Sequence, residues 1–217
     1  MSAGSDRVVA LRRLLDERFP PARRHDSRRI PTGVPAVDDA LGGGLQTGTL
    51  TEFVSEHPSA GCQLSLAALL ASTRANRQRV ALVDAAQSFD IEGFDDAAIA
   101  HIVWVRCESL DACWRAADLV ARDPNYAVSV IDVRGFPEGM LLRVRDSIWT
   151  RLQRACEQAD TALLVQTTTA LVPNAARRLA FSLPLPVDAL TTGRAELIAM
   201  LPVELKRQRY RAREHAG

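Results

Sequence analysis

Short apolar runs alternate with helical segments along most of this 217-residue chain. The runs lack the polar alternation of a half-exposed strand, so each indicates a strand covered on both faces. Parallel strands joined by helices are the arrangement that buries such runs. We therefore expect an α/β fold with a mostly parallel sheet and helices on both faces. The expected strands are 50–54, 79–83, 101–105, 127–131 and 161–165.

The second half of the chain predicts one long helix and then an antiparallel extension of the sheet. Helical spacing continues from Pro137 to about Gln158, and Pro is favoured in a first helical turn. Three later segments have no helix between them, with Gly193 and Pro202 at hairpin-like connections. The sheet is then mixed rather than purely parallel. The expected helices are 37–41, 61–74, 110–121 and 137–158, and the later strands are 181–185, 196–200 and 203–207.

The length fits one core domain with short flanking segments. Residues 1–29 are expected to form an N-terminal helix, carrying Leu11 and Leu15 on one side, and a basic linker. Residues 30–209 are expected to form the core domain, and residues 210–217 a basic tail.

Composition argues against several classes of function. The formal net charge is +1, so the whole molecule has no strong attraction to nucleic acid or to a membrane surface. No apolar stretch approaches the length of a membrane span or resembles a signal peptide. The four cysteines and four histidines lack metal-binding spacing, which predicts buried free thiols. We expect a cytoplasmic protein without a membrane partner or a metal.

Arginines cluster at both ends of the chain. A short basic run is either a solvated tether or a set of weak, salt-dependent contacts to DNA phosphates. Both interpretations remain open for these residues, which are Arg23, Arg24, Arg28, Arg29, Arg211 and Arg213.

Three glycine-containing segments, 30–33, 37–45 and 48–53, stand in an ordered series. They closely resemble, with the spacing kept, the run that leads into the phosphate-binding loop of RecA recombinases. The glycines in such a run permit positive φ angles and close backbone approach. The resemblance implies a RecA-like core.

The phosphate-binding loop itself departs from the family. It requires Gly-x-x-x-x-Gly-Lys-Thr/Ser, where the lysine neutralises phosphate and the hydroxyl holds Mg²⁺. Lys206 is the only lysine of the chain. Ala60 stands at the second glycine, Gly61 at the lysine and Cys62 at the hydroxyl residue. The resemblance therefore implies a degenerate ATP site, without a bound cofactor.

Other family positions are partly kept. Ala86 replaces the glutamate that positions the attacking water, so it has no acid-base capability. Asp132 matches the aspartate that helps to hold Mg²⁺, although a strand-end cap also explains it. Gln166 matches the polar sensing residue, and segment 167–173 is far shorter than the second DNA-binding loop of the recombinases. These residues imply lost ATP hydrolysis.

The late segment 203–209 resembles the family strand whose lysines reach the ATP of a neighbouring subunit. Arg207 and Arg209 occupy those positions, at the period of two that places them on one face of a strand. A solvated basic tail explains them equally well. With Leu11 and Leu15, they are the candidate interface for a RecA partner.

A RecA-like frame of this length with a degenerate ATP site resembles the ImuA group of bacterial mutagenesis cassettes, which is related to SulA-like proteins. The resemblance implies a non-enzymatic adaptor or regulator in DNA-damage-induced mutagenesis and translesion synthesis. Its implied partners are RecA and an ImuB-type polymerase-like protein, with at most weak, sequence-independent DNA binding. The alternatives are a SulA-like division inhibitor that binds a tubulin-like protein, and a residual ATPase.

Overall fold

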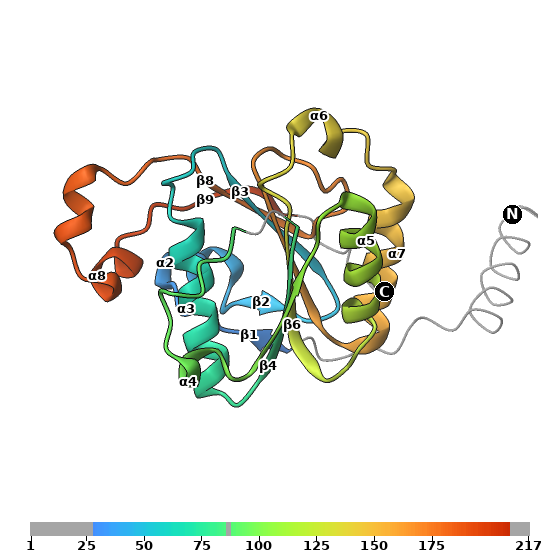
Figure 1. Ribbon diagram of the computed structural model, residues 1–217, viewed down its shortest axis with the longest axis horizontal. Helices are drawn as coiled ribbons and strands as arrows, with labels where there is room; N and C mark the ends of the chain where they lie inside the picture. The colour runs from blue at the N-terminus through green and yellow to red at the C-terminus, as the bar shows by residue number, and fades with distance from the viewer. Residues whose placement is uncertain (1–27, 86–87, 209–217) are drawn as a thin grey trace, which may run out of the picture.

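One seven-stranded sheet forms the centre of the molecule, with strand order β5-β4-β6-β7-β3-β8-β9 (Figure 1). The computed structural model describes residues 28–85 and 88–208. All neighbouring strands are parallel except β8 and β9, so the expected mostly parallel mixed sheet is confirmed. The strands are β3 (Leu50–Ser55), β4 (Arg79–Asp84), β5 (Ile102–Arg106), β6 (Tyr126–Asp132), β7 (Ala162–Thr167), β8 (Arg177–Phe181) and β9 (Glu204–Gln208).

Helices cover both faces of this sheet (Figure 1). One face packs against α2 (Pro35–Leu41), α3 (Cys62–Ala75), α4 (Asp96–Ile99) and α8 (Arg194–Ala199), and the other against α5 (Leu110–Ala121), α6 (Glu138–Leu141) and α7 (Asp146–Ala159). Each face has its own apolar cluster, because side chains of successive strand residues point to opposite sides. A short 3₁₀ helix, η1 (Val187–Thr191), precedes α8. No helix among the described residues has the length and apolar composition of a membrane span.

The glycine-rich lead-in folds as a small separate ladder beside the sheet. Strand β1 (Arg29–Ile30) pairs antiparallel with β2 (Leu45–Gln46). Gly44 lies between them with a φ of 118°, and a Cβ atom there would collide with the carbonyl oxygen of Ile30. The predicted positive φ and close backbone approach are therefore confirmed at this position.

Arg29 belongs to the core and not to a solvated linker. Its guanidinium donates to the carbonyl oxygens of Leu41 at 2.5 Å and Gly44 at 3.3 Å. It therefore ties β1 to the end of α2, so Arg29 is not part of a free tether. Arg28 is exposed. The other expected DNA contacts, Arg23, Arg24, Arg211 and Arg213, lie outside the described residues, as do Leu11, Leu15, Ala86 and Arg209.

The long helix expected over 137–158 is interrupted, since α6 ends at Leu141 and α7 begins at Asp146. A continuous helix would place Arg145 near the same stripe as buried Leu141 and Leu152. Burying an unpaired guanidinium is costly. Extended backbone at Arg145, with φ −69° and ψ 139°, leaves that side chain exposed.

The predicted antiparallel extension is only partly correct. Strand β8 covers Arg177–Phe181 rather than 181–185 and runs parallel to β3, so β9 is the antiparallel strand of the seven-stranded sheet. Segment 196–200 is not a strand, because α8 occupies Arg194–Ala199 and Gly193 is its N-cap. Alanine, glutamate and leucine in this segment favour a helix.

A buried carboxylate on β3 forms an ion pair with β8 and accepts hydrogen bonds from the loop after β7. Glu52 on β3 is fully buried, and one carboxylate oxygen accepts from the backbone nitrogens of Leu171 at 2.6 Å and Val172 at 3.0 Å and from the Thr167 hydroxyl at 3.2 Å. The other oxygen accepts from Nε of Arg178 at 2.5 Å. One carboxylate thus holds β3, the 167–172 loop and β8 together.

Glu52→Gln is expected to lower the free energy of unfolding by about 3–5 kcal/mol, because it leaves the Arg178 guanidinium without its counter-charge. Urea denaturation of the wild type and the variant measures the change. The matched control is Glu204→Gln, since Glu204 pairs with Lys206 at 2.6 Å on the surface. That control is expected to have little effect. Equal losses in the two variants would contradict a special role of the buried pair.

Candidate functional site

Three polar residues form a row at the carboxyl edge of the parallel strands, where α/β proteins commonly bind ligands. Asp84 on β4 is in register with Asp132 on β6, and Asp132 is in register with Gln166 on β7. Residues paired in this way point to the same face, which here is the face covered by α3. All three are at least 99% buried. The row coincides with the degenerate ATP site expected from the sequence.

Asp132 is already neutralised by a cation of this chain. Arg134 donates Nε to Oδ1 at 2.9 Å and a terminal nitrogen to Oδ2 at 2.6 Å. The Ser88 hydroxyl donates to Oδ2 at 2.8 Å, and the Arg134 backbone nitrogen donates to Oδ1 at 3.1 Å. This bidentate pair occupies both carboxylate oxygens. The aspartate expected as a magnesium ligand or a strand-end cap is thus the partner of a nearly buried arginine.

Sequence reasoning missed Arg134. The sequence showed that the loop lysine is absent. It did not show that the Arg134 guanidinium lies next to the first turn of α3, where its charge acts on Cys62. The available signal was the sequence Asp132-Val133-Arg134, in which the two charged residues have the strand period of two.

The second carboxylate of the row holds a loop. Asp84 accepts from the backbone nitrogens of Ser88 at 3.0 Å and Phe89 at 3.2 Å, and from the indole nitrogen of Trp104 at 3.2 Å. The chain after β4 therefore returns over the carboxyl edge, where Ser88 also reaches Asp132. Both acids of the site are satisfied by protein donors.

The first turn of α3 is covered by the segment between β8 and β9. Gly61 is the N-cap of α3 with a φ of 91°, and a Cβ atom there would collide with Cδ2 of Leu201. Leu201 is 2% exposed, and Ala60 and Cys62 are fully buried. The Leu185 nitrogen donates to the Ser59 carbonyl at 2.9 Å, which attaches the same segment to the loop. An apolar side chain therefore packs where a phosphate would meet the helix N-terminus.

Cys62 is not arranged as a reactive thiol. Its pKa is raised to about 11, mainly because the thiol is buried; the Arg134 guanidinium opposes this shift, and the Asp132 carboxylate adds to it. A thiol with such a pKa stays protonated at neutral pH, so it is a poor nucleophile. All four cysteines are buried and free, which confirms the expectation from their spacing.

Gln166 is the member of the row whose side chain makes no hydrogen bond among the described residues. Both amide atoms are buried and have no partner in the described part of the protein. A buried polar group in that state reduces stability, typically by about 1–3 kcal/mol. Gln166 is the residue that the sequence matched to a polar sensing position.

The remaining described candidate lies elsewhere. Arg207 is on β9, the edge strand, where its backbone is in register with Arg178 on β8. Strands β3, β7 and β8 separate β9 from the row formed by Asp84 and Asp132. The structure therefore does not bring Arg207 into the degenerate ATP site of its own chain.

The site predicts no micromolar binding of Mg²⁺-ATP and no ATP turnover. The loop over residues 55–62 has no lysine to neutralise phosphate, and loss of such a preorganised cation removes transition-state stabilisation of about 3 kcal/mol or more. Calorimetry and a phosphate-release assay test this with the wild type and with Leu201→Ala, which removes the apolar cover. Binding restored in Leu201→Ala would show that the cover alone blocks a competent site.

The contact between Gly61 and Leu201 is open to a double-mutant cycle. Gly61→Ala is expected to destabilise the protein, since a left-handed backbone costs a non-glycine residue about 1–2 kcal/mol and the clash with Leu201 adds to this. Leu201→Ala alone is expected to cost about 2–5 kcal/mol. In the Leu201→Ala background, Gly61→Ala should cost less, with a coupling of about 0.5–3 kcal/mol in urea denaturation. Identical costs in both backgrounds would rule out the packing.

Comparisons with known proteins include a partial similarity to a recombination protein. Part of the chain is 45% identical over 62 residues to the DNA repair and recombination protein RadA of Ignicoccus hospitalis, an alignment that covers 26% of this chain and 19% of RadA. The chain therefore spans well under two thirds of this relative. No family model matches the chain. Together with the sheet, the similarity supports a RecA-like α/β core.

Proposed function

We propose that this protein is a non-catalytic RecA-fold adaptor or regulator that acts in DNA-damage-induced mutagenesis and translesion synthesis, as its resemblance to the ImuA group implies. One observation carries the non-catalytic part of the proposal. The chain fills its own nucleotide position, with Leu201 against Gly61 and Arg134 paired to Asp132. A RecA-like frame kept without nucleotide chemistry suits a binding function.

The frame is held together by hydrogen bonds within the chain, without a nucleotide. The two carboxylates of the row, Asp84 and Asp132, are here engaged with loop backbone, Ser88 and Arg134. Such internal hydrogen bonds keep loops and helices in place without a ligand. Rigid elements present a binding surface at low entropic cost.

A RecA filament is the partner that we propose for the edge of the sheet formed by β9. Filament interfaces are heterologous, with one face of a protomer meeting a different face of the next. A subunit with a basic edge strand and no nucleotide face could dock at one filament end and then fail to accept a further subunit through ATP. The protein would limit filament length there, and could bring an ImuB-type partner to the same place.

The test is an assay of RecA filament length and strand exchange with RecA from the same organism, ATP and single-stranded DNA. The wild-type protein is expected to shorten filaments, and Arg207→Ala/Arg209→Ala is expected to act more weakly. Arg74→Ala/Arg77→Ala is the matched control, because it removes two exposed arginines from the end of α3.

Urea denaturation of each variant separates lost binding from lost folding. The filament role is wrong if the wild type has no effect on filaments, or if the β9 variant acts as strongly as the wild type. Any direct DNA binding is expected to be weak and to disappear as salt rises, since only phosphate neutralisation is available.

A further inference from the structure

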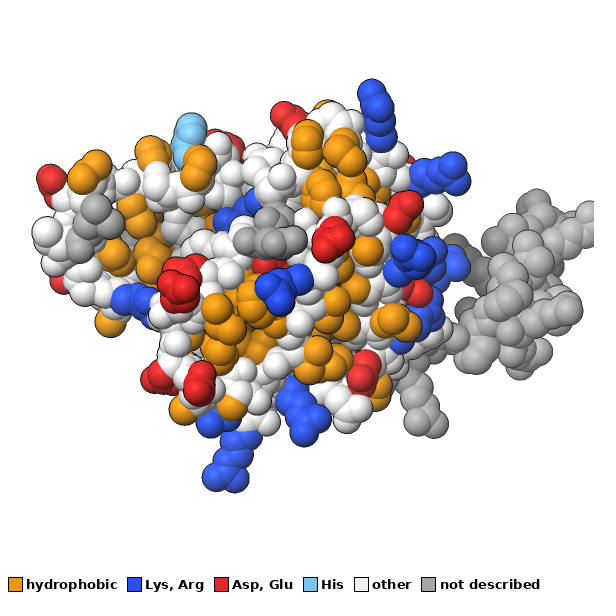
Figure 2. All heavy atoms as spheres, in the orientation of Figure 1, with side chains coloured by type: hydrophobic (Ala, Val, Ile, Leu, Met, Phe, Trp, Pro, Cys, Tyr) orange, Lys and Arg blue, Asp and Glu red, His pale blue; other side chains and the backbone are white. Residues whose placement is uncertain are grey.

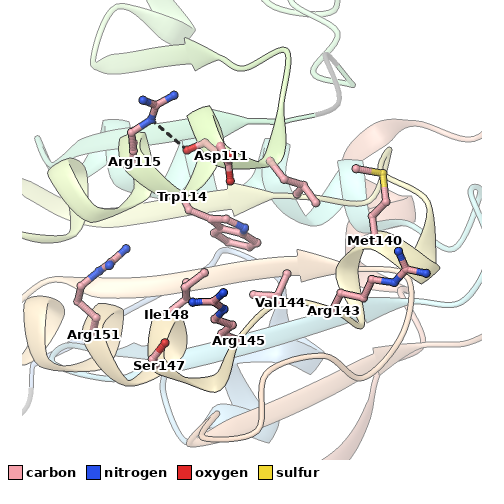
Figure 3. A pocket seen from close by; sticks show the side chains of 11 residues that line it. Asp111, Trp114, Arg115, Met140, Arg143, Val144, Arg145, Ser147, Ile148 and Arg151 are labelled. Carbon is pink, nitrogen blue, oxygen red and sulfur yellow. Dashed lines mark hydrogen bonds between the residues drawn. The ribbon is translucent and has the colours of Figure 1, made fainter.

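A groove runs between α5 and the α6–α7 segment, on the face of the sheet opposite α3 (Figure 3). Its volume is about 640 Å³. Trp114 points into it from α5, and Val144 and Ile148 face it from the other side (Figure 3). The degenerate ATP site contributes no residue to this groove.

The floor of the groove is apolar and firmly supported. The Trp114 ring meets the buried Trp149 ring edge to face, with centroids 5.1 Å apart. Leu110, Val144 and Ile148 are partly buried against the same cluster. At one end, Met140 is 47% exposed, and flexible methionines adapt to irregular apolar ligands. The groove can therefore accept apolar side chains without a change of fold.

The rim of the groove is basic. Arg143 and Arg145 are exposed, and their guanidinium groups make no hydrogen bond or ion pair within residues 28–85 and 88–208. Arg151 shares the carboxylate of Asp118 with Arg122, at 2.9 Å and 3.1 Å. Asp111 is the one acidic residue that lines the groove. The positive charge on this rim therefore exceeds the negative charge.

An apolar floor with a basic rim is complementary to a ligand that is apolar on one side and acidic on the other. We propose that this groove binds an acidic peptide segment of a partner protein, with aliphatic or aromatic side chains on the floor formed by Trp114 and carboxylates against Arg143 and Arg145. A groove of this chemistry can bind such a peptide whatever pathway the protein serves.

Two other occupants fit less well. A nucleic acid backbone would gain from the arginines but would leave the apolar floor unused and would meet Asp111. The terminal segments of this chain, 1–27 and 209–217, each contain more arginines than acids, so their charge does not complement the rim. An acidic partner peptide is the occupant that uses both the floor and the rim.

The experiment measures fluorescence anisotropy of a labelled synthetic peptide in which Leu and Phe at helical spacing alternate with Asp and Glu. Two matched peptides replace the acids by Lys, or the apolar residues by Ser. The acidic apolar peptide is expected to bind most tightly to the wild-type protein. Arg143→Glu/Arg145→Glu is expected to weaken binding of the acidic apolar peptide by about tenfold or more and to improve binding of the Lys peptide.

Arg74→Glu/Arg77→Glu is the matched control, since it makes the same charge change on exposed arginines at the end of α3. It should leave binding of the acidic peptide within about twofold of the wild type, because screening weakens charges beyond about 10 Å at ordinary salt. Equal effects of the two double variants would overturn the proposal. So would equal binding of the Ser peptide, or displacement of the acidic peptide by a single-stranded oligonucleotide at lower concentration.

Discussion

The buried carboxylate of Glu52 connects the parts of this molecule on which the candidate site depends. It lies on the strand between β7 and β8 and accepts hydrogen bonds from the loop that joins those two strands. Its ion pair with Arg178 then fixes β8 beside β3. The segment that follows β8 carries Leu201 to Gly61. Removing one partner of a buried pair leaves an uncompensated charge, which is costly. Loss of this pair would therefore disturb both the sheet at β8 and the segment that places Leu201 against Gly61.

Figure 2 shows how charged and apolar side chains are distributed on one face of the molecule. Basic side chains stand out along the side that carries α5 and α7, while apolar side chains lie exposed between the charges. The interior charges of the carboxyl edge are absent from the surface, since Asp84 and Asp132 are both buried. Because Asp84 and Asp132 are buried, a partner protein would have to bind to other, exposed parts of the surface. The arginine rim of the α5–α7 groove and the edge strand β9 are two such faces.

Much of the architecture was predictable, because periodicity and turn residues are local signals. The apolar runs predicted β3, β4, β5, β6 and β7 to within two residues at each end, and the lead-in glycines predicted the close turn at Gly44. The predictions failed where long-range packing decided the outcome. The interruption before α7 depends on where Arg145 would fall relative to a buried stripe, and the role of Arg29 depends on carbonyl groups of α2.

The sequence by itself determined the α/β class, the mostly parallel pairing of the strands and the absence of a phosphate-binding lysine, since these follow from residue type and spacing. It did not determine what replaced the lost chemistry. The fold pairs Arg134 with Asp132, places Leu201 against Gly61 and pairs Arg178 with Glu52. Two of these contacts join residues far apart in the chain, and their geometry depends on strand order and loop path. Tertiary structure therefore decided that Leu201 covers the N-terminus of α3 and that Arg178 pairs with Glu52.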